Sequence, residues 1–311
     1  MIKTKQQNTQ ERLTAMTTCA GCPIGLVART VLEAVDGPAV ITGATGCMEV
    51  TSTIYPNTSW KDPYIHSVFG NVGATISGVE TAWRSLEKRG KTKGKKKPKF
   101  IVFAGDGGSY DIGLQALSGA LERGHDFLFV TYDNEGYMNT GHQRSGSTPI
   151  GASTETTPAG KESIGKAIRK KDLMQIVTAH RPAYAATANI GFLDDYKKKV
   201  RKALAVEGPA FLLVFSPCVP LWKYHESQTI NIAELGTKTN FWPLYEYENG
   251  EFKLSYEPKE EIPVEEFYKT QGRFKHLFKR DEKETKEIFQ AIQQITDQEW
   301  EKVKKMCKQT V

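Results

Sequence analysis

Five short apolar runs, separated by segments of helical length, constrain the fold of this chain more than any other feature of its sequence. The runs show no alternation of polar and apolar residues, which is typical of strands buried on both faces of a sheet. The predicted strands are residues 39–42, 100–104, 127–132, 184–188 and 211–215. The predicted helices are residues 23–35, 70–88, 111–123 and 194–206. This order predicts an α/β fold, with a mostly parallel sheet and helices on both of its faces.

The chain changes character after Cys218. Residues 219–280 are rich in aromatic residues, proline, glutamate and lysine and show no clear period, and residues 281–309 have the charged pattern of one or two helices. We therefore predict an α/β domain at residues 1–218 and an irregular C-terminal extension at residues 219–311 that ends in helices. The extension is expected to pack on the domain or on a partner subunit.

Composition excludes several classes of protein. Of the 311 residues, 39% are hydrophobic, which is enough for a substantial core and excludes global disorder. No stretch approaches the roughly 20 apolar residues that span a bilayer, and the polar start of the chain lacks the apolar core of a signal peptide. A formal net charge of +6 is too small to indicate nucleic-acid binding. We expect a cytoplasmic protein that binds neither nucleic acid nor membrane.

One basic run holds much of the positive charge. It spans residues 88–99 and has the sequence KRGKTKGKKKPK. A block of like charge is most often a solvated loop. The alternative is a docking site for an acidic protein.

A glycine-rich turn with one carboxylate follows the second predicted strand. This turn, Gly-Asp-Gly-Gly at residues 105–108, leads into a predicted helix, and Asn134 lies just past the next strand. The carboxyl ends of parallel strands share one edge of a sheet, where ligands bind. Mg²⁺ prefers oxygen ligands, which the Asp106 carboxylate, the Asn134 amide and the Gly136 carbonyl could supply. Because glycines allow a close backbone approach and a helix N-terminus favours an anion, the pattern predicts a magnesium-bound diphosphate; two ordinary turns are the alternative.

Four of the five cysteines lie in segments rich in glycine or proline. Cys19 and Cys22 form a CxxC motif, Cys47 follows the first predicted strand and Cys218 follows the last. Such positions favour ligands over core residues, since a buried free cysteine more often lies within an apolar run. Four converging thiolates could hold a [4Fe–4S] cluster or a zinc ion, and the CxxC pair could be redox-active, so these possibilities stay open on spacing alone. Cys307 lies in a polar helical pattern and is given no ligand role.

Four segments together resemble the beta subunits of pyruvate:ferredoxin oxidoreductase and related 2-oxoacid:ferredoxin oxidoreductases. They are TCAGCP, ATGCMEVTSTIYPNTSW, GDGGSYDIGLQALSGALERGHD and YDNEGYMNTGHQRSGSTP, and the resemblance covers about residues 17–220. It implies the thiamine-diphosphate-binding fold, with thiamine diphosphate (ThDP), Mg²⁺ and a [4Fe–4S] cluster as cofactors. The implied metal ligands are Cys19, Cys22, Cys47 and Cys218 for the cluster and Asp106, Asn134 and Gly136 for Mg²⁺. The residues implied to bind the organic cofactor are Gly105, Asp106, Gly107, Gly108, Asn134, Gly136, Thr140, Thr45 and Cys47.

The resemblance also implies a reaction and a set of partners. Pyruvate, coenzyme A and oxidised ferredoxin would give acetyl-CoA, CO₂ and reduced ferredoxin in a complex with alpha, gamma and delta subunits. Asn139 is the implied catalytic residue, in contact with the substrate; stabilisation of its own turn is the alternative role. His66 and Gln143 are candidates to support the site, although a structural role is the favoured one for His66.

Several points stay open. ThDP activation requires a glutamate, which the family places on the alpha subunit, so this chain is expected to be inactive alone. Pro23 follows Cys22 where many relatives have glycine, and oxalate, 2-oxoisovalerate, 2-oxoglutarate or an aryl-pyruvate could replace pyruvate as substrate. Two other hypotheses are a zinc-binding scaffold subunit without catalysis and a ThDP decarboxylase without redox function, which leaves the four cysteines unexplained.

Overall fold

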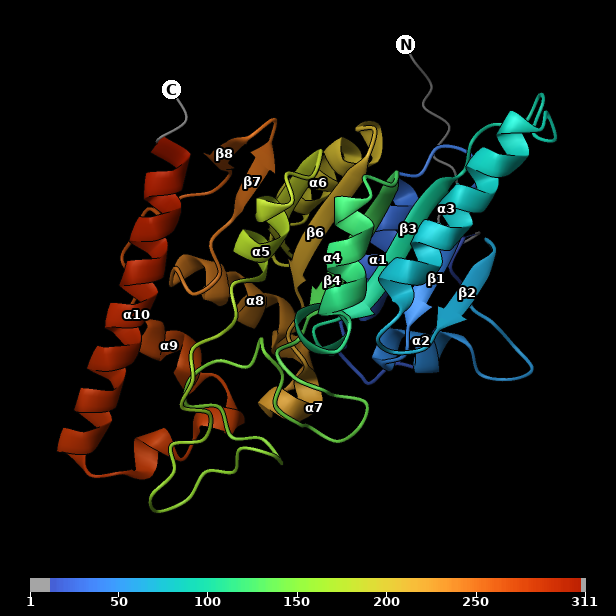
Figure 1. Cartoon of the computed structure of the whole chain (residues 1–311). Helices are drawn as coiled ribbons and strands as arrows, with labels where there is room; N and C mark the ends of the chain where they lie inside the picture. Colours follow the sequence, from blue (N-terminus) through green and yellow to red (C-terminus); the bar gives the residue numbers. More distant parts are fainter. Residues whose placement is uncertain (1–11, 309–311) are drawn as a thin grey trace, which may run out of the picture.

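An eight-stranded sheet runs through the computed structural model, which describes residues 12–308. The strand order is β2-β1-β3-β4-β6-β5-β7-β8, in which the first six strands are parallel and the last two are antiparallel (Figure 1). The strands are β1 (Ala39–Ala44), β2 (Tyr64–Ser67), β3 (Lys99–Gly105), β4 (Phe127–Asp133), β5 (Tyr184–Asn189), β6 (Pro209–Phe215), β7 (Tyr245–Glu248) and β8 (Glu251–Leu254). The α-helices are α1 (Ile24–Glu33), α2 (Cys47–Ser52), α3 (Val72–Lys88), α4 (Leu114–Glu122), α5 (Leu173–Ala179), α6 (Leu193–Ala205), α7 (Val219–Trp222), α8 (Thr229–Lys238), α9 (Val264–Lys269) and α10 (Glu282–Lys308).

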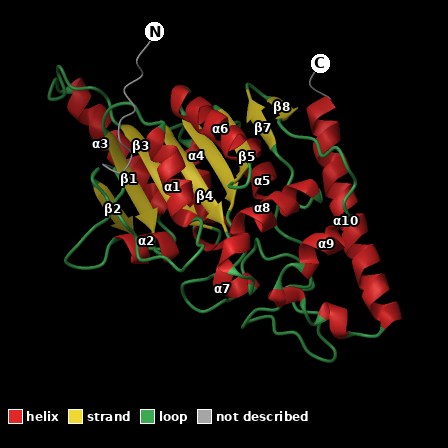
Figure 2. Cartoon of the chain, turned by 180° about the vertical axis from the view of Figure 1, so that it is seen from behind, coloured by secondary structure: helices red, strands yellow, loops and turns green. Residues whose placement is uncertain are grey.

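The predicted fold class is confirmed. All five predicted strands are present as β1, β3, β4, β5 and β6, and each extends slightly beyond its predicted bounds. Every residue of β4 and β6 is buried. The reason is that α3 and α4 pack on one face of the sheet while α1 and α6 pack on the other (Figures 1 and 2). A strand covered on both faces has no solvated side, which explains its uninterrupted apolar sequence.

The helix after β3 begins later than the sequence predicts. We expected it to start at residue 111, but α4 starts at Leu114, and a π-helical turn at Gly107–Asp111 precedes it. The two segments are packed so tightly that a Cβ atom on Gly113 would lie 1.8 Å from the Gly108 carbonyl oxygen. A wide turn of this kind is frequent at functional sites.

The segment after Cys218 extends the same sheet. It contributes the β7–β8 hairpin, which pairs with β5, and the long helix α10, which passes beside β8 and α9 (Figure 2). The prediction of a helical end is confirmed up to Lys308, and residues 309–311 lie outside the described part of the chain. The division of the chain at residue 218 stays a prediction.

The basic run lies at the amino ends of the strands. It joins α3 to β3, and its Lys96 and Lys97 form ion pairs with Asp36 and Asp126. The carboxyl ends of β1 and β3 lie at the opposite edge of the sheet, so an acidic protein docked on this loop would face away from them. Within residues 12–308, no helix is both long enough and apolar enough to cross a membrane.

Candidate active site

A pocket lies where the chain changes direction across the sheet. After β1 the chain turns towards β2, and after β3 it turns the other way towards β4, although β1 and β3 are neighbours. In open α/β sheets such a switch point leaves a crevice at the carboxyl ends of the strands. The pocket there is lined by Thr45, Gly46, Cys47, Phe69, Gly105, Asp106, Gly107, Tyr132, Asn134, Gly136, Tyr137, Met138, Asn139 and Thr140. Of the residues predicted to bind the organic cofactor, only Gly108 is not in this lining; it packs against Ala44 instead.

The three predicted magnesium ligands meet at one side of this pocket. The head of the Asn134 amide lies 2.9 Å from Asp106 Oδ1 and 3.0 Å from the Gly136 carbonyl oxygen. Without a cation, the amide nitrogen can face these two acceptors and donate to both. With the amide oxygen facing them, this oxygen lies about 3 Å from each of the other two, which is the spacing of adjacent ligands in an octahedral Mg²⁺ shell. The residues present therefore fit a magnesium ion.

Asp106 is buried without the partners that a buried carboxylate needs. It is 1% exposed, and its Oδ2 atom has no hydrogen-bond partner within the described residues. Burial, together with the nearby Asp133 carboxylate, raises the pKa of Asp106 well above its usual value. A bound cation would supply the missing charge and the missing contact at Oδ2.

Asp133, in contrast to Asp106, is a buried carboxylate with a structural role. It accepts hydrogen bonds from Tyr110 Oη at 2.6 Å and from Ser147 Oγ at 2.5 Å, and it pairs with Lys170 Nζ at 3.1 Å. Its oxygens are already satisfied, so Asp133 stabilises the end of β4 and leaves Asp106 as the carboxylate available to a ligand.

A tight loop after β4 places Asn139 in the pocket. The backbone N–H of Tyr137 donates to the Gln143 carbonyl at 2.9 Å, which brings the two ends of the loop together. Thr140 Oγ1 donates to Gln143 Oε1 at 2.5 Å and holds the tip. The ring of Tyr137 lies over Gly107, where an added Cβ would be 2.4 Å from Tyr137 Cε1. The glycine at residue 107 is thus required by the close approach of this ring.

The four predicted cluster ligands are near enough to interact electrostatically, and Cys47 among them lines the pocket. Burial raises the pKa of Cys22 to about 11 and the pKa of both Cys47 and Cys218 to about 12, and the charges of the neighbouring cysteines raise each of them further. Cys19 is exposed, and its charge contributes to the raised pKa of Cys22, Cys47 and Cys218. The described residues contain no group of three or more metal-ligating side chains gathered around a single point. Cys307 lies in α10, and it is not among the groups that raise the pKa of Cys22, Cys47 and Cys218.

Cys47 connects the cysteine group to the pocket. Its thiol interacts electrostatically with Cys22, Cys19 and Asp106, and the nearby Asn139 side chain partly offsets the rise in its pKa. Cys47 is also part of the pocket lining, next to Thr45. One thiol is therefore near both the predicted magnesium site and the other cysteines.

The sequence did not indicate the residues that hold the loop after β4. Glu135 has a left-handed backbone, with φ of 64°, and its buried carboxylate pairs with Arg273 at 2.6 Å. The Arg273 guanidinium stacks on the Trp222 ring at 3.8 Å. A glutamate directly after the Asn134 position was visible in the sequence, but its partner lies 138 residues further along the chain.

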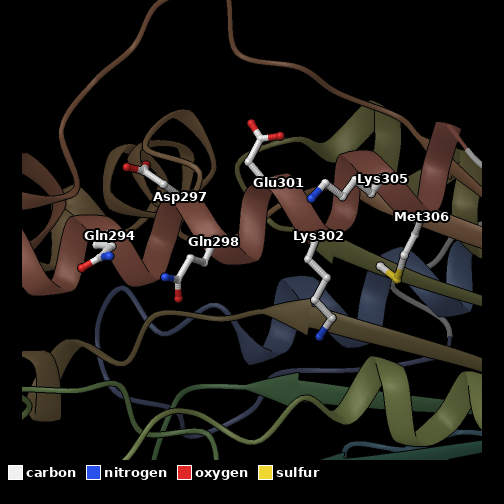
Figure 3. Close-up of a pocket in the computed structure, with 7 residues that line it drawn as sticks. All are labelled: Gln294, Asp297, Gln298, Glu301, Lys302, Lys305 and Met306. Atoms are coloured by element: carbon white, nitrogen blue, oxygen red, sulfur yellow. The ribbon is translucent and has the colours of Figure 1, made fainter.

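Another hollow lies along α10 (Figure 3). It is lined by Gln294, Asp297, Gln298, Glu301, Lys302, Lys305 and Met306, and Figure 3 shows these side chains spread along one helix. Lys302 is already paired with Asp172 at 2.6 Å. None of the predicted site residues lies in this hollow.

Known proteins share both the sequence and the fold of this chain. Residues 44–214 match the family model described as the thiamine pyrophosphate enzyme, C-terminal TPP binding domain. Pyruvate synthase subunit PorB of Thermotoga maritima is 50% identical over 92% of this chain and 88% of its own length. Ketoisovalerate oxidoreductase subunit VorB of Pyrococcus abyssi is 43% identical over 94% of this chain and 91% of its own length.

A solved structure supports the same assignment at the level of the fold. The 2-oxoglutarate:ferredoxin oxidoreductase from Magnetococcus marinus matches with a TM-score of 0.59 and 19% identity over 72% of both chains. The fold, the family model and the two relatives agree with one another. The chain belongs to the PorB/VorB family of beta subunits of 2-oxoacid:ferredoxin oxidoreductases and is one subunit of an oxidoreductase complex.

Proposed function

We propose that this chain is the beta subunit of a pyruvate:ferredoxin oxidoreductase and holds ThDP, Mg²⁺ and the proximal [4Fe–4S] cluster. The observation that carries the proposal is that Cys47 lines the same pocket as Asp106 and Asn139, while its thiol also interacts electrostatically with Cys19 and Cys22. A cluster bound at Cys47 would therefore border a cofactor bound in this pocket and would take electrons from it directly.

The residues of this chain have distinct roles in the proposal. Asp106, Asn134 and Gly136 hold Mg²⁺ and, through it, the diphosphate, while the cysteines hold the cluster. When bound, ThDP supplies the nucleophilic carbon for decarboxylation of the 2-oxoacid, and the cluster accepts the released electrons one at a time. Asn139 lines the pocket together with Cys47, so its amide is placed to orient the substrate.

A cluster suits the cysteine arrangement better than a zinc ion. Zinc takes four sulfurs at about 2.3 Å around a single point. A [4Fe–4S] cluster takes one thiolate at each of four irons, so its ligands are spread around a larger body. Among the described residues, no three metal-ligating side chains form a group that could hold a single metal ion, which favours ligands spread in this way over a zinc site.

Pyruvate is the favoured substrate, in the reaction with coenzyme A and ferredoxin. The 50% identity to a pyruvate synthase subunit exceeds the 43% identity to a ketoisovalerate oxidoreductase subunit. Among the residues that line the pocket, Asp106 is the only acidic one, and it belongs to the magnesium site. The glutamate that activates ThDP is therefore assigned to the alpha subunit, and gamma and delta subunits and ferredoxin are the other proposed partners.

The test is a cofactor assay on the anaerobically purified complex. We expect iron, acid-labile sulfide and ThDP in the wild type, and turnover of pyruvate with coenzyme A and ferredoxin. Cys22→Ser, Cys47→Ser and Cys218→Ser should each lower the iron content, whereas Cys307→Ser should not. Zinc without sulfide would contradict the cluster. If the complex prefers another acid in a 2-oxoacid panel, that acid replaces pyruvate as the assigned substrate. Turnover by the isolated chain would contradict the shared site.

A further inference from the structure

Three polar side chains form a line from the pocket to the surface. Thr45, which lines the pocket, has its Oγ1 atom 2.7 Å from Nε2 of His66. On the other side of the imidazole ring, His66 Nδ1 lies 3.6 Å from Oε1 of Glu49. The three residues come from three neighbouring elements: the end of β1, the edge strand β2 and the first turn of α2.

The backbone fixes this arrangement. Residue 43 of β1 is in register with His66 of β2, and the backbone N–H of Thr45 donates to the Ser67 carbonyl at 3.2 Å. Glu49 is held separately, because Thr53 Oγ1 donates to its Oε1 atom at 2.8 Å. The Glu49 side chain is 12% exposed and that of His66 is 46% exposed. The ring is thus oriented with a carboxylate at one nitrogen and a hydroxyl at the other.

The Thr45 hydroxyl has a single proton and two neighbours besides the pocket: Nε2 of His66 and, at 3.4 Å, the Ser67 carbonyl oxygen. A ring without a proton on Nε2 accepts the hydroxyl proton, and Thr45 then presents only lone pairs to the pocket. A ring with a proton on Nε2 donates to Thr45, and the hydroxyl proton is then directed to the long Ser67 contact or to a ligand. The carboxylate of a 2-oxoacid is a stronger acceptor than a carbonyl at 3.4 Å, so this arrangement favours the substrate.

We propose that Thr45 is a specificity-determining residue that donates a hydrogen bond to the 2-oxoacid, and that His66 and Glu49 position its hydroxyl. This inference rests on the proposed function, because the ligand is the 2-oxoacid substrate of that site. His66 and Glu49 touch neither the pocket nor the cofactor and act only through Thr45.

The experiment uses the complete complex with substitutions in this chain. Thr45→Val removes the hydroxyl at nearly constant shape, and His66→Leu removes both ring nitrogens. Each should raise the KM for pyruvate and the Kd of oxamate, an unreactive isostere of pyruvate measured by calorimetry, by about tenfold, the effect of one lost hydrogen bond to a charged group. In His66→Leu, which lies outside the pocket lining, ThDP and iron contents should stay at the wild-type level.

Two further variants separate positioning from folding. His66→Gln keeps a polar group near the position of Nε2 and should recover most of the oxamate affinity, whereas Glu49→Gln should lie between the wild type and His66→Leu. His180→Gln is the matched control, since His180 also pairs with a hydroxyl, that of Ser118 at 3.1 Å, but lies outside the pocket lining. It should leave KM and the oxamate Kd unchanged.

The outcomes distinguish this inference from the proposed function. If the wild type turns over pyruvate but His66→Leu leaves KM and the oxamate Kd unchanged, the positioning role is wrong and the function stands. If Thr45→Val lowers the ThDP content and not the oxamate affinity, Thr45 serves the cofactor, and the inference is also wrong. If the wild-type complex turns over no 2-oxoacid, both fail together.

Discussion

The indole Nε1 of Trp222 donates a hydrogen bond of 2.9 Å to the backbone carbonyl oxygen of Asn134. Trp222 ends α7, which begins directly after Cys218, and its own N–H donates to the Cys218 carbonyl at 2.9 Å. One buried residue therefore contacts the loop of the proposed magnesium site through its side chain and the loop of a proposed cluster ligand through its backbone.

We predict that Trp222→Phe destabilises the chain and weakens ThDP binding. The Asn134 carbonyl loses its indole donor in a buried site, which costs about 1–3 kcal/mol. Trp83→Phe is the matched control, because the buried Nε1 of Trp83 has no partner within the described residues. Urea unfolding should show a larger loss for Trp222→Phe than for Trp83→Phe; equal losses would mean that the hydrogen bond contributes nothing.

Removing Arg273 should leave the buried Glu135 carboxylate only partly compensated. Arg273→Met deprives Glu135 of its 2.6 Å partner, whereas Lys170 Nζ stays 3.1 Å from the other carboxylate oxygen, so the loss should lie below the about 3–5 kcal/mol of a buried ion pair broken on one side. The double variant Glu135→Gln/Arg273→Met should be more stable than Arg273→Met alone, because it removes the carboxylate that has lost its closer partner. A double-mutant cycle by urea unfolding measures this, and simple additivity of the two substitutions would argue against the pairing.

Asp106→Asn should separate cofactor binding from folding. The substitution keeps the size of the side chain but removes the charge that a cation requires, so we expect the affinity for ThDP with Mg²⁺ to fall by about 1.5–3 kcal/mol, or at least tenfold. Burial raises the pKa of Asp106, so its neutral replacement should leave the thermal midpoint unchanged or raise it. Asp126→Asn, at a surface pair with Lys97, is the control and should leave cofactor affinity at the wild-type value.

Two glycine substitutions should have opposite effects on stability. Gly107→Ala places a Cβ within 2.4 Å of the Tyr137 ring, so the ring must leave its position and stability should fall by about 1–3 kcal/mol. Gly78→Ala, on the exposed side of α3 with no atom within 4 Å of the added Cβ, should instead stabilise the helix by up to about 1 kcal/mol. Differential scanning calorimetry of both variants tests the pair, and a stable Gly107→Ala with full ThDP affinity would contradict the described packing.

The chain should lose stability as the pH falls below about 6.5, the ordinary pKa of histidine. Burial lowers the pKa of His276, His125 and His142 in the folded state. The unfolded chain therefore binds these protons at a higher pH than the folded chain, so their contribution is fully present above the unfolded pKa and is lost as the pH falls through the folded pKa values. His276→Gln should flatten the dependence of the urea midpoint on pH between 7.5 and 5, because the variant takes up about one proton fewer when it unfolds. The exposed His225→Gln should leave the slope as it is.

The sequence predicts the strands best where both faces of the sheet are covered. β4 and β6 are entirely buried and have no polar residues in their interiors other than Thr131. β2 is not predicted, because as an edge strand it leaves Ile65 and His66 exposed and reads as part of a loop. The β7–β8 hairpin is also not predicted, because its strands are only four residues long and β8 is partly exposed along its length.

The sequence predicts the site because a parallel sheet collects its strand ends at one edge. It cannot predict which strands are neighbours. β6 lies between β4 and β5, so that Phe215 pairs with Asp133 and Cys218 comes next to the loop that follows Asn134. Arg273 could not be predicted at all, since nothing in the local pattern of an aromatic-rich stretch shows that one arginine will be buried against Trp222.

In the sequence the C-terminal third looks separate from the proposed site, yet it contacts both the magnesium part and the cysteine part of that site. Arg273 pairs with Glu135 beside the proposed magnesium position, and Thr229 Oγ1 donates at 2.8 Å to the Gly21 carbonyl inside the CxxC loop. A fragment cut after residue 218 would keep every proposed ligand but lose both anchors. The shortest piece of this chain able to hold its cofactors is therefore much longer than the stretch that contains the ligands.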